Sequence, residues 1–125
     1  METENTKTPK SDAAGQAQMR KGVLEFCILC ILSENDAYPS EIIEAMKESK
    51  LIVVEGTLYP LLMRLKNEGR LAYEWKESTS GPPRKYYRLT PAGKELLNEL
   101  YTSWSELVGS VEQIVKKYSP NLINN

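Results

Sequence analysis

The stretch EGTLYPLLMRLKNEG, residues 55–69, decides the fold of this 125-residue chain. Its leucines recur at steps of three and four residues, the spacing that places side chains on one face of an amphipathic helix. These leucines are Leu58, Leu61, Leu62 and Leu65. Gly69 follows them at the position where a helix often ends in a left-handed residue. The stretch therefore predicts a helix from about Glu55 to Asn67 with one buried face.

Two further helices are expected before this one. Residues 16–33 carry apolar side chains around much of a helical circumference, so this helix should be buried on more than one side. The next helix should begin near Pro39, whose missing N–H is not needed in a first turn, and end around Ser49. Residues 51–54 read Leu-Ile-Val-Val and have strand character. Residues 1–15 contain no large apolar residue after the initial methionine, which predicts a disordered tail.

A hairpin and a long helix are expected after Gly69. Residues 70–76 alternate in polarity and residues 84–89 are rich in aromatics, while the polar Gly/Pro linker over 78–83 predicts a long tip. Thr90 and Pro91 fit the N-cap and the first position of a helix over 91–118, with a flexible tail over 119–125. This order of elements is typical of a winged helix-turn-helix, with residues 16–90 as a DNA-binding domain. The sequence thus predicts a mainly α fold with a small β-hairpin.

The charge of the chain has to be considered by position. The net charge is −1, so the chain lacks the overall basicity that is usual in nucleic-acid-binding domains. Residues 60–88, however, carry seven cationic and three acidic side chains, a local balance of +4. Such a patch can neutralise DNA phosphates. A solvated charged face is the alternative interpretation.

Two details favour DNA over a merely solvated face. The first turn of the helix over 55–67 presents Gly56, Thr57 and Tyr59 together with backbone N–H groups, which are natural phosphate contacts. Tyr59 has an alternative role as a core aromatic with its hydroxyl at the surface. Arg84 and Lys85 follow the expected hairpin tip, where two adjacent cations can reach a DNA backbone or minor groove.

Other classes of site find little support in the sequence. There is no histidine, and the only cysteines are Cys27 and Cys30, which we expect to fill the core, with a redox or metal role as the alternative. Without a Gly-rich phosphate loop, a metal cluster or an activated nucleophile, the sequence predicts neither an enzyme nor a cofactor or metal site. No apolar stretch is long enough to span a membrane and no secretory signal is visible, which predicts a cytoplasmic protein.

The last helix carries apolar residues in a heptad-like rhythm, which is typical of a helix pair. These residues are Leu97, Leu100, Trp104, Leu107, Val111 and Ile114. About 28 residues at 1.5 Å each give a helix of roughly 42 Å, longer than so small a domain can cover. We therefore expect a homodimer, in which two DNA-reading helices can face a two-fold site. The alternative is that the helix folds back onto its own domain.

Two motifs in this order and spacing resemble the PadR family of transcriptional regulators: GTLYPLLMRLKNEG at 56–69 and GPPRKYYRLTPAG at 81–93. The resemblance covers residues 20–117 and implies a winged helix, a C-terminal dimerisation helix and, mostly, repression relieved by a small molecule. It places Thr57, Tyr59 and Arg64 on the DNA-facing helix. The full set of residues expected at DNA is Tyr38, Gly56, Thr57, Tyr59, Arg64, Lys66, Arg84 and Lys85. Tyr38 matches an aromatic of the family, although Pro39 and Ser40 beside it depart from the family pattern.

The chain is similar to the short PadR subgroup, which lacks a separate C-terminal domain. In members of that subgroup, paired tryptophans line a flat pore between subunits that takes planar molecules, which implies Trp104 as a candidate ligand contact. A plain core role for Trp104 is the alternative, and Phe26 is bulky enough to fill such a pore. Three functions follow: a ligand-responsive repressor, a DNA-binding regulator without a small-molecule site, and a winged-helix protein-interaction module that binds no DNA.

Overall fold

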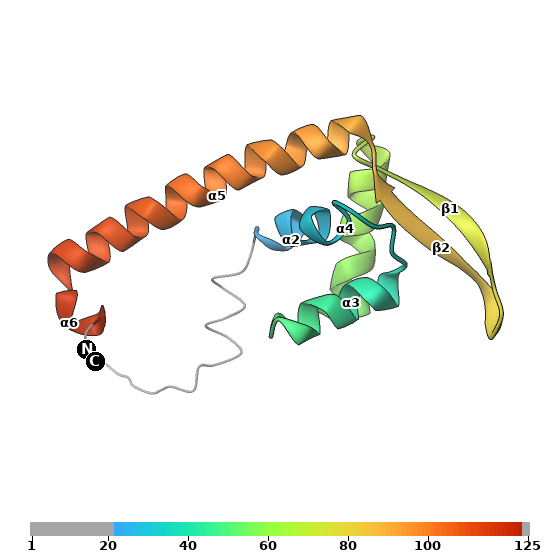
Figure 1. Ribbon diagram of the computed structural model, residues 1–125, viewed down its shortest axis with the longest axis horizontal. Coiled ribbons are helices and arrows are strands. Elements are labelled where there is room, and N and C mark those ends of the chain that lie inside the picture. Colours follow the sequence, from blue (N-terminus) through green and yellow to red (C-terminus); the bar gives the residue numbers. More distant parts are fainter. Residues whose placement is uncertain (1–21, 124–125) are drawn as a thin grey trace.

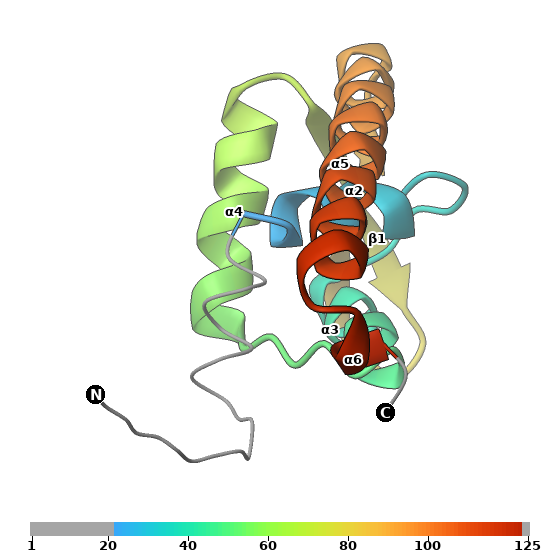
Figure 2. The same cartoon turned by 90° about the vertical axis from the view of Figure 1, so that its left-hand side faces the viewer.

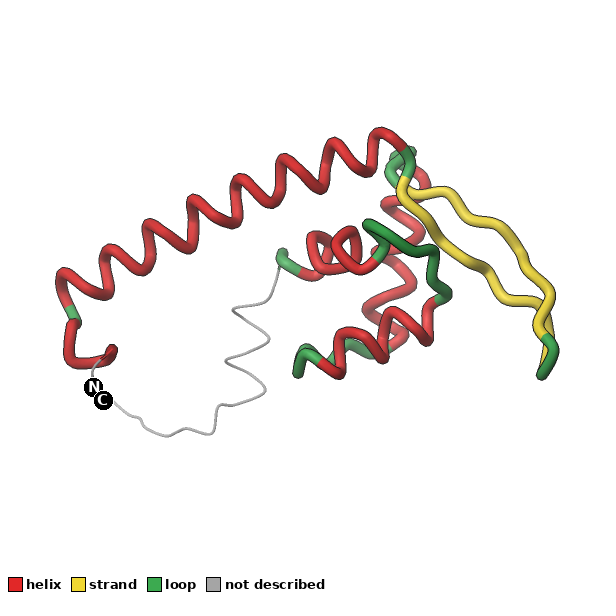
Figure 3. Tube along the Cα trace, in the orientation of Figure 1, coloured by secondary structure: helices red, strands yellow, loops and turns green. Residues whose placement is uncertain are grey.

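Three short helices form the body of the protein, and a hairpin and a long helix extend from it in different directions (Figure 1). The structure is a computed structural model and describes residues 22–123. Its elements are α2 (Leu24–Ile31), α3 (Pro39–Glu48), α4 (Glu55–Asn67), β1 (Leu71–Ser78), β2 (Gly81–Leu89), α5 (Pro91–Tyr118) and α6 (Pro120–Ile123). Figure 3 shows α2, α3 and α4 first along the trace, then the two strands, and then α5 and α6. The predicted mainly α fold with a β-hairpin and a long C-terminal helix is confirmed.

The core lies where the three short helices meet. Every one of them contributes side chains that are fully buried, since burying a large aliphatic side chain is the main favourable term in folding. These side chains are Ile28, Leu29, Ile42, Met46, Leu58, Leu62 and Leu65. Helix α4 has the predicted bounds and the predicted buried stripe, with Leu61 half-buried at the edge of this core. Helix α3 begins at Pro39, also as predicted.

The predicted strand over residues 51–54 is wrong. These residues form an extended loop, which begins with Lys50 in the left-handed region at φ 68° and a hydrogen bond from the Leu51 N–H to the Met46 carbonyl, 2.8 Å. Val53 is buried from this loop, which accounts for the apolar pattern. A strand also needs a partner, and the outer edge of β2 is occupied by Ala37, whose N–H and carbonyl both bond Tyr87.

The hairpin is longer than predicted and its tip is shorter. Strands β1 and β2 pair antiparallel from Leu71 opposite Leu89 out to Ser78 opposite Gly81, with an irregularity just before Ser78. Only two residues remain for the turn, so the expected long tip over 78–83 is wrong. Pro82 and Pro83 lie in β2 instead. A two-stranded sheet consists of edge strands alone, where a missing proline N–H is tolerated.

A tight joint fixes the start of α5 to the connection between α4 and β1. The Thr90 hydroxyl accepts a hydrogen bond from the Gly93 N–H (3.0 Å), as its predicted capping role requires, and donates one to the Gly69 carbonyl (2.6 Å). The Arg70 guanidinium donates to the Ala92 carbonyl at 2.9 Å. A Cβ on Gly93 would collide with the backbone oxygen of Arg70, so only glycine fits there. Gly69 has the left-handed φ of 79° that ends α4.

Helix α5 covers its own domain only near its start and then extends away from it (Figure 1). In Figure 2 the helix is seen toward its far end, with its later turns in front of α2. Leu96, Leu97 and Leu100 pack against the core, mainly beside α2. Beyond them most apolar side chains of α5 are exposed: Tyr101, Trp104, Leu107, Val111, Ile114 and Tyr118. Residues 120–123, expected in a flexible tail, form the single turn α6. No helix within residues 22–123 combines the length and the apolar character that a membrane span requires.

The C-terminal end of the first helix, α2, differs from its prediction. Helix α2 ends at Ile31, slightly before the predicted end at Ser33, while its predicted start at residue 16 and the tail over 1–15 lie outside the described residues. Cys27 is half-buried and Cys30 is exposed, so Cys30 is not the core filler that was expected. Burial raises the pKa of both thiols, which keeps them protonated. In the described part of the chain, no three metal-ligating side chains gather.

Candidate nucleic-acid interface

Helix α4 turns one exposed stripe toward the hairpin. Tyr59, Met63 and Lys66 follow one another at helical spacing on the side away from the buried leucines, and Tyr59 and Met63 are 47% and 63% exposed. The Lys66 ammonium lies 5.7 Å from the ring centre of Tyr73 on β1. The stripe therefore meets the hairpin at its base and continues onto it.

The two faces of the hairpin carry different side chains. Because side chains alternate along a strand and the register sets Trp75 opposite Lys85 and Lys76 opposite Arg84, neighbouring residues point to opposite faces. Arg84 and Lys85, which the sequence presents as one pair of cations, are consequently separated. Lys85 shares a face with Trp75 and Tyr73, whereas Arg84 shares a face with Lys76.

The face with Lys85 joins the stripe of α4 in one cationic and aromatic surface. The Lys85 ammonium lies 4.4 Å from the ring centre of Tyr73, 5.3 Å from Trp75 and 6.0 Å from Tyr87. Trp75 is 61% exposed, whereas Tyr87, whose ring centre lies 5.6 Å from that of Tyr73, is buried, and burial raises the pKa of its phenol. We call the hairpin of β1 and β2 the wing and this surface the α4–wing surface. Its members are Tyr59, Met63, Lys66, Tyr73, Trp75 and Lys85.

The charge of the α4–wing surface is not cancelled by its neighbours. Within residues 22–123, neither Lys66 nor Lys85 forms an ion pair with a carboxylate. Cations held over aromatic rings keep their charge while their side chains are restrained. This surface can therefore receive an anionic partner that also offers flat or apolar groups.

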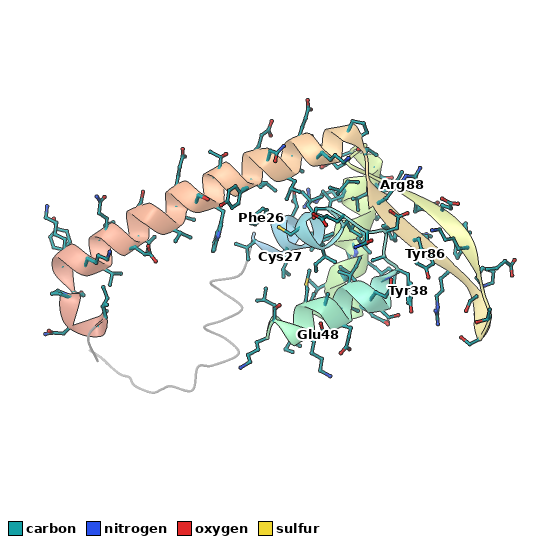
Figure 4. The ribbon with its side chains drawn as sticks, in the orientation of Figure 1. Phe26, Cys27, Tyr38, Glu48, Tyr86 and Arg88 are labelled. Carbon is teal, nitrogen blue, oxygen red and sulfur yellow. The ribbon has the colours of Figure 1, made fainter. Side chains whose placement is uncertain are left out.

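The opposite face of the hairpin lies against the loop that leads into α3. The Arg84 guanidinium lies 4.4 Å from the ring centre of Tyr38, and the Tyr38 ring meets that of Tyr86 edge-on at 5.1 Å. The Lys76 ammonium lies 4.8 Å from the Tyr86 ring and 4.0 Å from a carboxylate oxygen of Asp36. Figure 4 shows Tyr38 and Tyr86 side by side at this junction.

Arg64 does not join the α4–wing surface. Its guanidinium pairs with Glu25 of α2 at 2.6 Å and with Glu68, one turn along α4, at 3.4 Å. The hydrogen bond to Glu25 is the main reason that the pKa of Arg64 is raised. The structure thus turns this predicted DNA contact toward α2, on the side of α4 away from the hairpin.

The start of α4 is exposed but its N–H groups are partly used. Gly56 and Thr57 lie at the surface, and the Thr57 N–H donates to the Val54 carbonyl at 3.0 Å. Val54, the N-cap residue, offers no side-chain hydrogen bond to the turn. A Cβ on Gly56 would meet no atom of residues 22–123 within 4 Å, so packing against this part of the chain does not require the glycine.

Three members of the α4–wing surface were not among the residues singled out in the sequence: Met63, Tyr73 and Trp75. The alternation over residues 70–76 already places Tyr73 and Trp75 on one face of a strand, so this signal was available. Met63 carries no chemical signal of its own and stands out only once its 63% exposure is known.

Helix α5 holds the other predicted site residues. Leu97 and Leu100, expected at a dimer interface, pack against the domain's own core. Trp104 is 41% exposed, and Leu107, Val111 and Ile114 are exposed along the same stripe. Phe26 of α2 approaches α5 beside Tyr101, with 6.4 Å between ring centres.

Comparison with known proteins identifies the family. The model of the PadR-like family of transcriptional regulators matches residues 28–99, which run from α2 through α4 and the hairpin into α5. An uncharacterized protein of Lysinibacillus sphaericus is 32% identical over 90 residues, which cover 70% of this chain and 83% of the relative. A transcriptional regulator of Mycobacterium tuberculosis is 30% identical over 94 residues, which cover 75% and 87%.

Solved structures agree with this match. A PadR-like transcription factor from Bacteroides fragilis shares 58% identity with a TM-score of 0.67, over 81% of this chain and 98% of that structure. A PadR family transcriptional regulator from Eggerthella lenta shares 33% identity with a TM-score of 0.75, over 83% and 91%. These similarities confirm the resemblance that the two sequence motifs indicated. The chain belongs to the PadR-like family of transcriptional regulators.

Proposed function

We propose that this regulator binds duplex DNA as a homodimer in the cytoplasm and represses transcription, with the α4–wing surface against the DNA. The observation that supports it best is that the exposed Lys66 and the half-buried Lys85 both lie over the ring of Tyr73 and have no carboxylate partner among the described residues. Such cations neutralise phosphates and release counterions, which supplies most of the affinity for a DNA backbone. The exposed aromatic rings between them offer flat surfaces to sugars and bases.

The start of α4 supports the same orientation. Gly56 is exposed and has open space around it, so a DNA backbone can approach this turn closely. Thr57 and Tyr59 add hydroxyl groups beside it. A recognition helix in the major groove contacts DNA with its N-terminal residues, and the wing beside it contacts the backbone.

The homodimer is supported by the apolar stripe on α5. From Trp104 to Ile114 the stripe is exposed, and it continues the row that begins with Leu97 and Leu100 on the domain's own core. A contiguous apolar face on a monomer usually marks an interface. A second copy of the same stripe is its self-complementary partner in a two-fold dimer.

The test of DNA binding is the salt dependence of affinity for DNA from the upstream region of the protein's own gene, measured by fluorescence anisotropy. Replacing Lys66 and Lys85 together by alanine should weaken binding and flatten the slope of log K against log salt by about 2 units, near 0.9 per lost phosphate contact. The control replaces Lys94 and Lys116 of α5, which removes the same charge away from the surface.

An unchanged slope in the Lys66/Lys85 variant would show that the α4–wing surface does not face DNA. Failure of the wild-type protein to bind any duplex would favour the alternative function, a winged-helix module that binds another protein.

We also propose that a small planar or phenolic molecule relieves repression by binding at Trp104. The support is a half-exposed indole between two small residues, Ser103 and Ser105, on the stripe assigned to the dimer. With Trp75 replaced by phenylalanine, planar dyes should quench Trp104 fluorescence in a saturable manner. Unchanged dye affinity after Trp104→Ala would place any effector elsewhere.

A further inference from the structure

The geometry points to Arg84 and Tyr38 as positioning residues that hold the wing on the body of the domain, while the adjacent Lys85 faces the DNA. The inference rests on the proposed DNA binding. It divides a set of residues that the sequence presents as equivalent DNA contacts into two roles, one on each face of the hairpin.

The contacts that hold the wing form a continuous chain across two segments far apart in the sequence. Arg84 lies over the Tyr38 ring, Tyr38 meets Tyr86 edge-on, and Lys76 lies over Tyr86 while approaching Asp36. We call these five residues the wing clamp. Asp36 and Tyr38 belong to the loop before α3, whereas the other three belong to the hairpin.

The wing clamp adds to a backbone connection at the same place. Ala37, between Asp36 and Tyr38, exchanges two hydrogen bonds with Tyr87 of β2, at 2.8 and 3.1 Å. That bridge holds the base of β2, and the wing clamp extends the attachment outward along the strand to Arg84. A hairpin of two strands is marginal by itself, so contacts of this kind decide how firmly its outer half is held.

Arg84 connects the hairpin to the body of the domain, whereas Lys85 contacts only the hairpin among the described residues. Among residues 22–123, the ring contacts of Lys85 are with side chains of the hairpin itself: the exposed Tyr73 and Trp75 and the buried Tyr87. The ring contact of Arg84 is with Tyr38, outside the hairpin. Loss of Arg84 should therefore loosen the wing, whereas loss of Lys85 should remove a charge from the surface that meets DNA.

The first measurement concerns the free protein, so it does not depend on DNA binding. Hydrogen exchange of the hairpin amides should be faster by about two- to fivefold in Arg84→Ala and in Tyr38→Ala, the range expected for one exposed cation–ring contact. Tyr38→Phe keeps the ring and should exchange like the wild type. Lys94→Ala on α5 is the control that removes a charge without touching the hairpin.

The second measurement uses the upstream duplex and the same variants. Arg84→Ala should weaken binding by about two- to fivefold with little change in salt slope, and Tyr38→Ala at least as much, because it also removes the contact with Tyr86. The double variant should be no weaker than Tyr38→Ala alone, because Arg84 acts through the ring that this substitution removes. Tyr38→Phe should bind like the wild type. Lys85→Ala should flatten the slope by about one unit.

The inference is overturned if Arg84→Ala flattens the salt slope as Lys85→Ala does, or if Tyr38→Phe weakens binding as strongly as Tyr38→Ala. It is also overturned if hairpin exchange is unchanged in both alanine variants. If the wild-type protein binds no duplex, the proposed function fails, and the exchange measurement still decides whether the wing clamp holds the hairpin.

Discussion

At the scale of single residues, Gly56 connects the structure of α4 to its proposed partner. Glycine in a helix costs roughly 0.5–1 kcal/mol relative to alanine. A Cβ at Gly56 would nevertheless meet nothing in the described part of the chain. Glycine at this position therefore lowers stability although packing does not require it. Residues that lower stability in this way are common where binding to a partner sets the choice of residue.

Replacing Gly56 by alanine should consequently raise stability and lower affinity for DNA. We expect about 0.5–1 kcal/mol more free energy of unfolding by urea titration, because the unfolded chain loses freedom and the helix gains a better former. Affinity for the upstream duplex should fall because the methyl group intrudes on the approaching backbone.

The two readouts of Gly56→Ala separate the possible roles of this glycine. A gain in stability with unchanged DNA affinity would remove Gly56 from the interface. A loss of stability would show that Gly56 relieves strain in the helix. Pro60 has no N–H to donate to the Gly56 carbonyl, and its ring crowds that carbonyl.

Residue roles were predictable from the sequence only where they depend on local spacing. The Thr90 cap and the left-handed Gly69 follow from neighbours in the chain and have the expected geometry. The ion pair of Arg64 joins it to Glu25, 39 residues away, and no local pattern indicates such a partner. For the same reason the contact of Arg84 with Tyr38 could not be foreseen.

At the scale of elements, the joint at the start of α5 determines how the long helix leaves the domain. Thr90, Arg70 and Gly93 together tie α5 to the end of α4 and the start of β1. Among these three residues, Gly93 is the one that no larger residue can replace, because the backbone oxygen of Arg70 occupies the space that a side chain would need.

Replacing Gly93 by alanine should therefore destabilise the protein, by about 1–3 kcal/mol, the usual cost of forcing extra volume into a packed site. Gly109→Ala is the matched control, since it lies on the same helix at an exposed position where a Cβ meets nothing. It should be neutral or stabilising by up to about 1 kcal/mol. Urea unfolding of both variants at one protein concentration measures the difference, and equal effects of the two substitutions would contradict the close approach at Arg70.

Elements with a strong period were predicted well, and elements set by tertiary partners were not. The bounds of α4 were predicted correctly, because apolar residues recur with the helical period over all 13 residues and are not compatible with a strand. Gly81, Pro82 and Pro83 are typical of turns, and nothing local shows that β1 extends far enough to pair with them. Residues 51–54 have the composition of a strand but form an extended loop that buries Val53 in the core.

At the scale of the whole molecule, the exposed part of α5 carries the proposed dimer. Sedimentation at micromolar concentration should give a mass near twice the 14.2 kDa of one chain. Leu107→Lys should shift the equilibrium toward the monomer, because it would bury an unpaired charge in an apolar interface. Gln113→Lys adds the same charge on the other side of α5 and should remain dimeric. Equal masses for the two variants would contradict an interface through this stripe.

The joint at the base of α5 has a consequence for how the two halves of such a dimer reach DNA. Because these contacts fix the direction in which α5 leaves α4, the crossing angle of α5 with the α5 of a second copy would, in the proposed dimer, set the distance between the two α4 helices. Over roughly 42 Å, a tilt of about 5° displaces the far end by about 4 Å, comparable to the rise of one base pair. If the proposed dimer forms, the protein would bind best to sites whose two halves have the spacing that this crossing angle sets, and a molecule bound where the two helices cross would change that spacing.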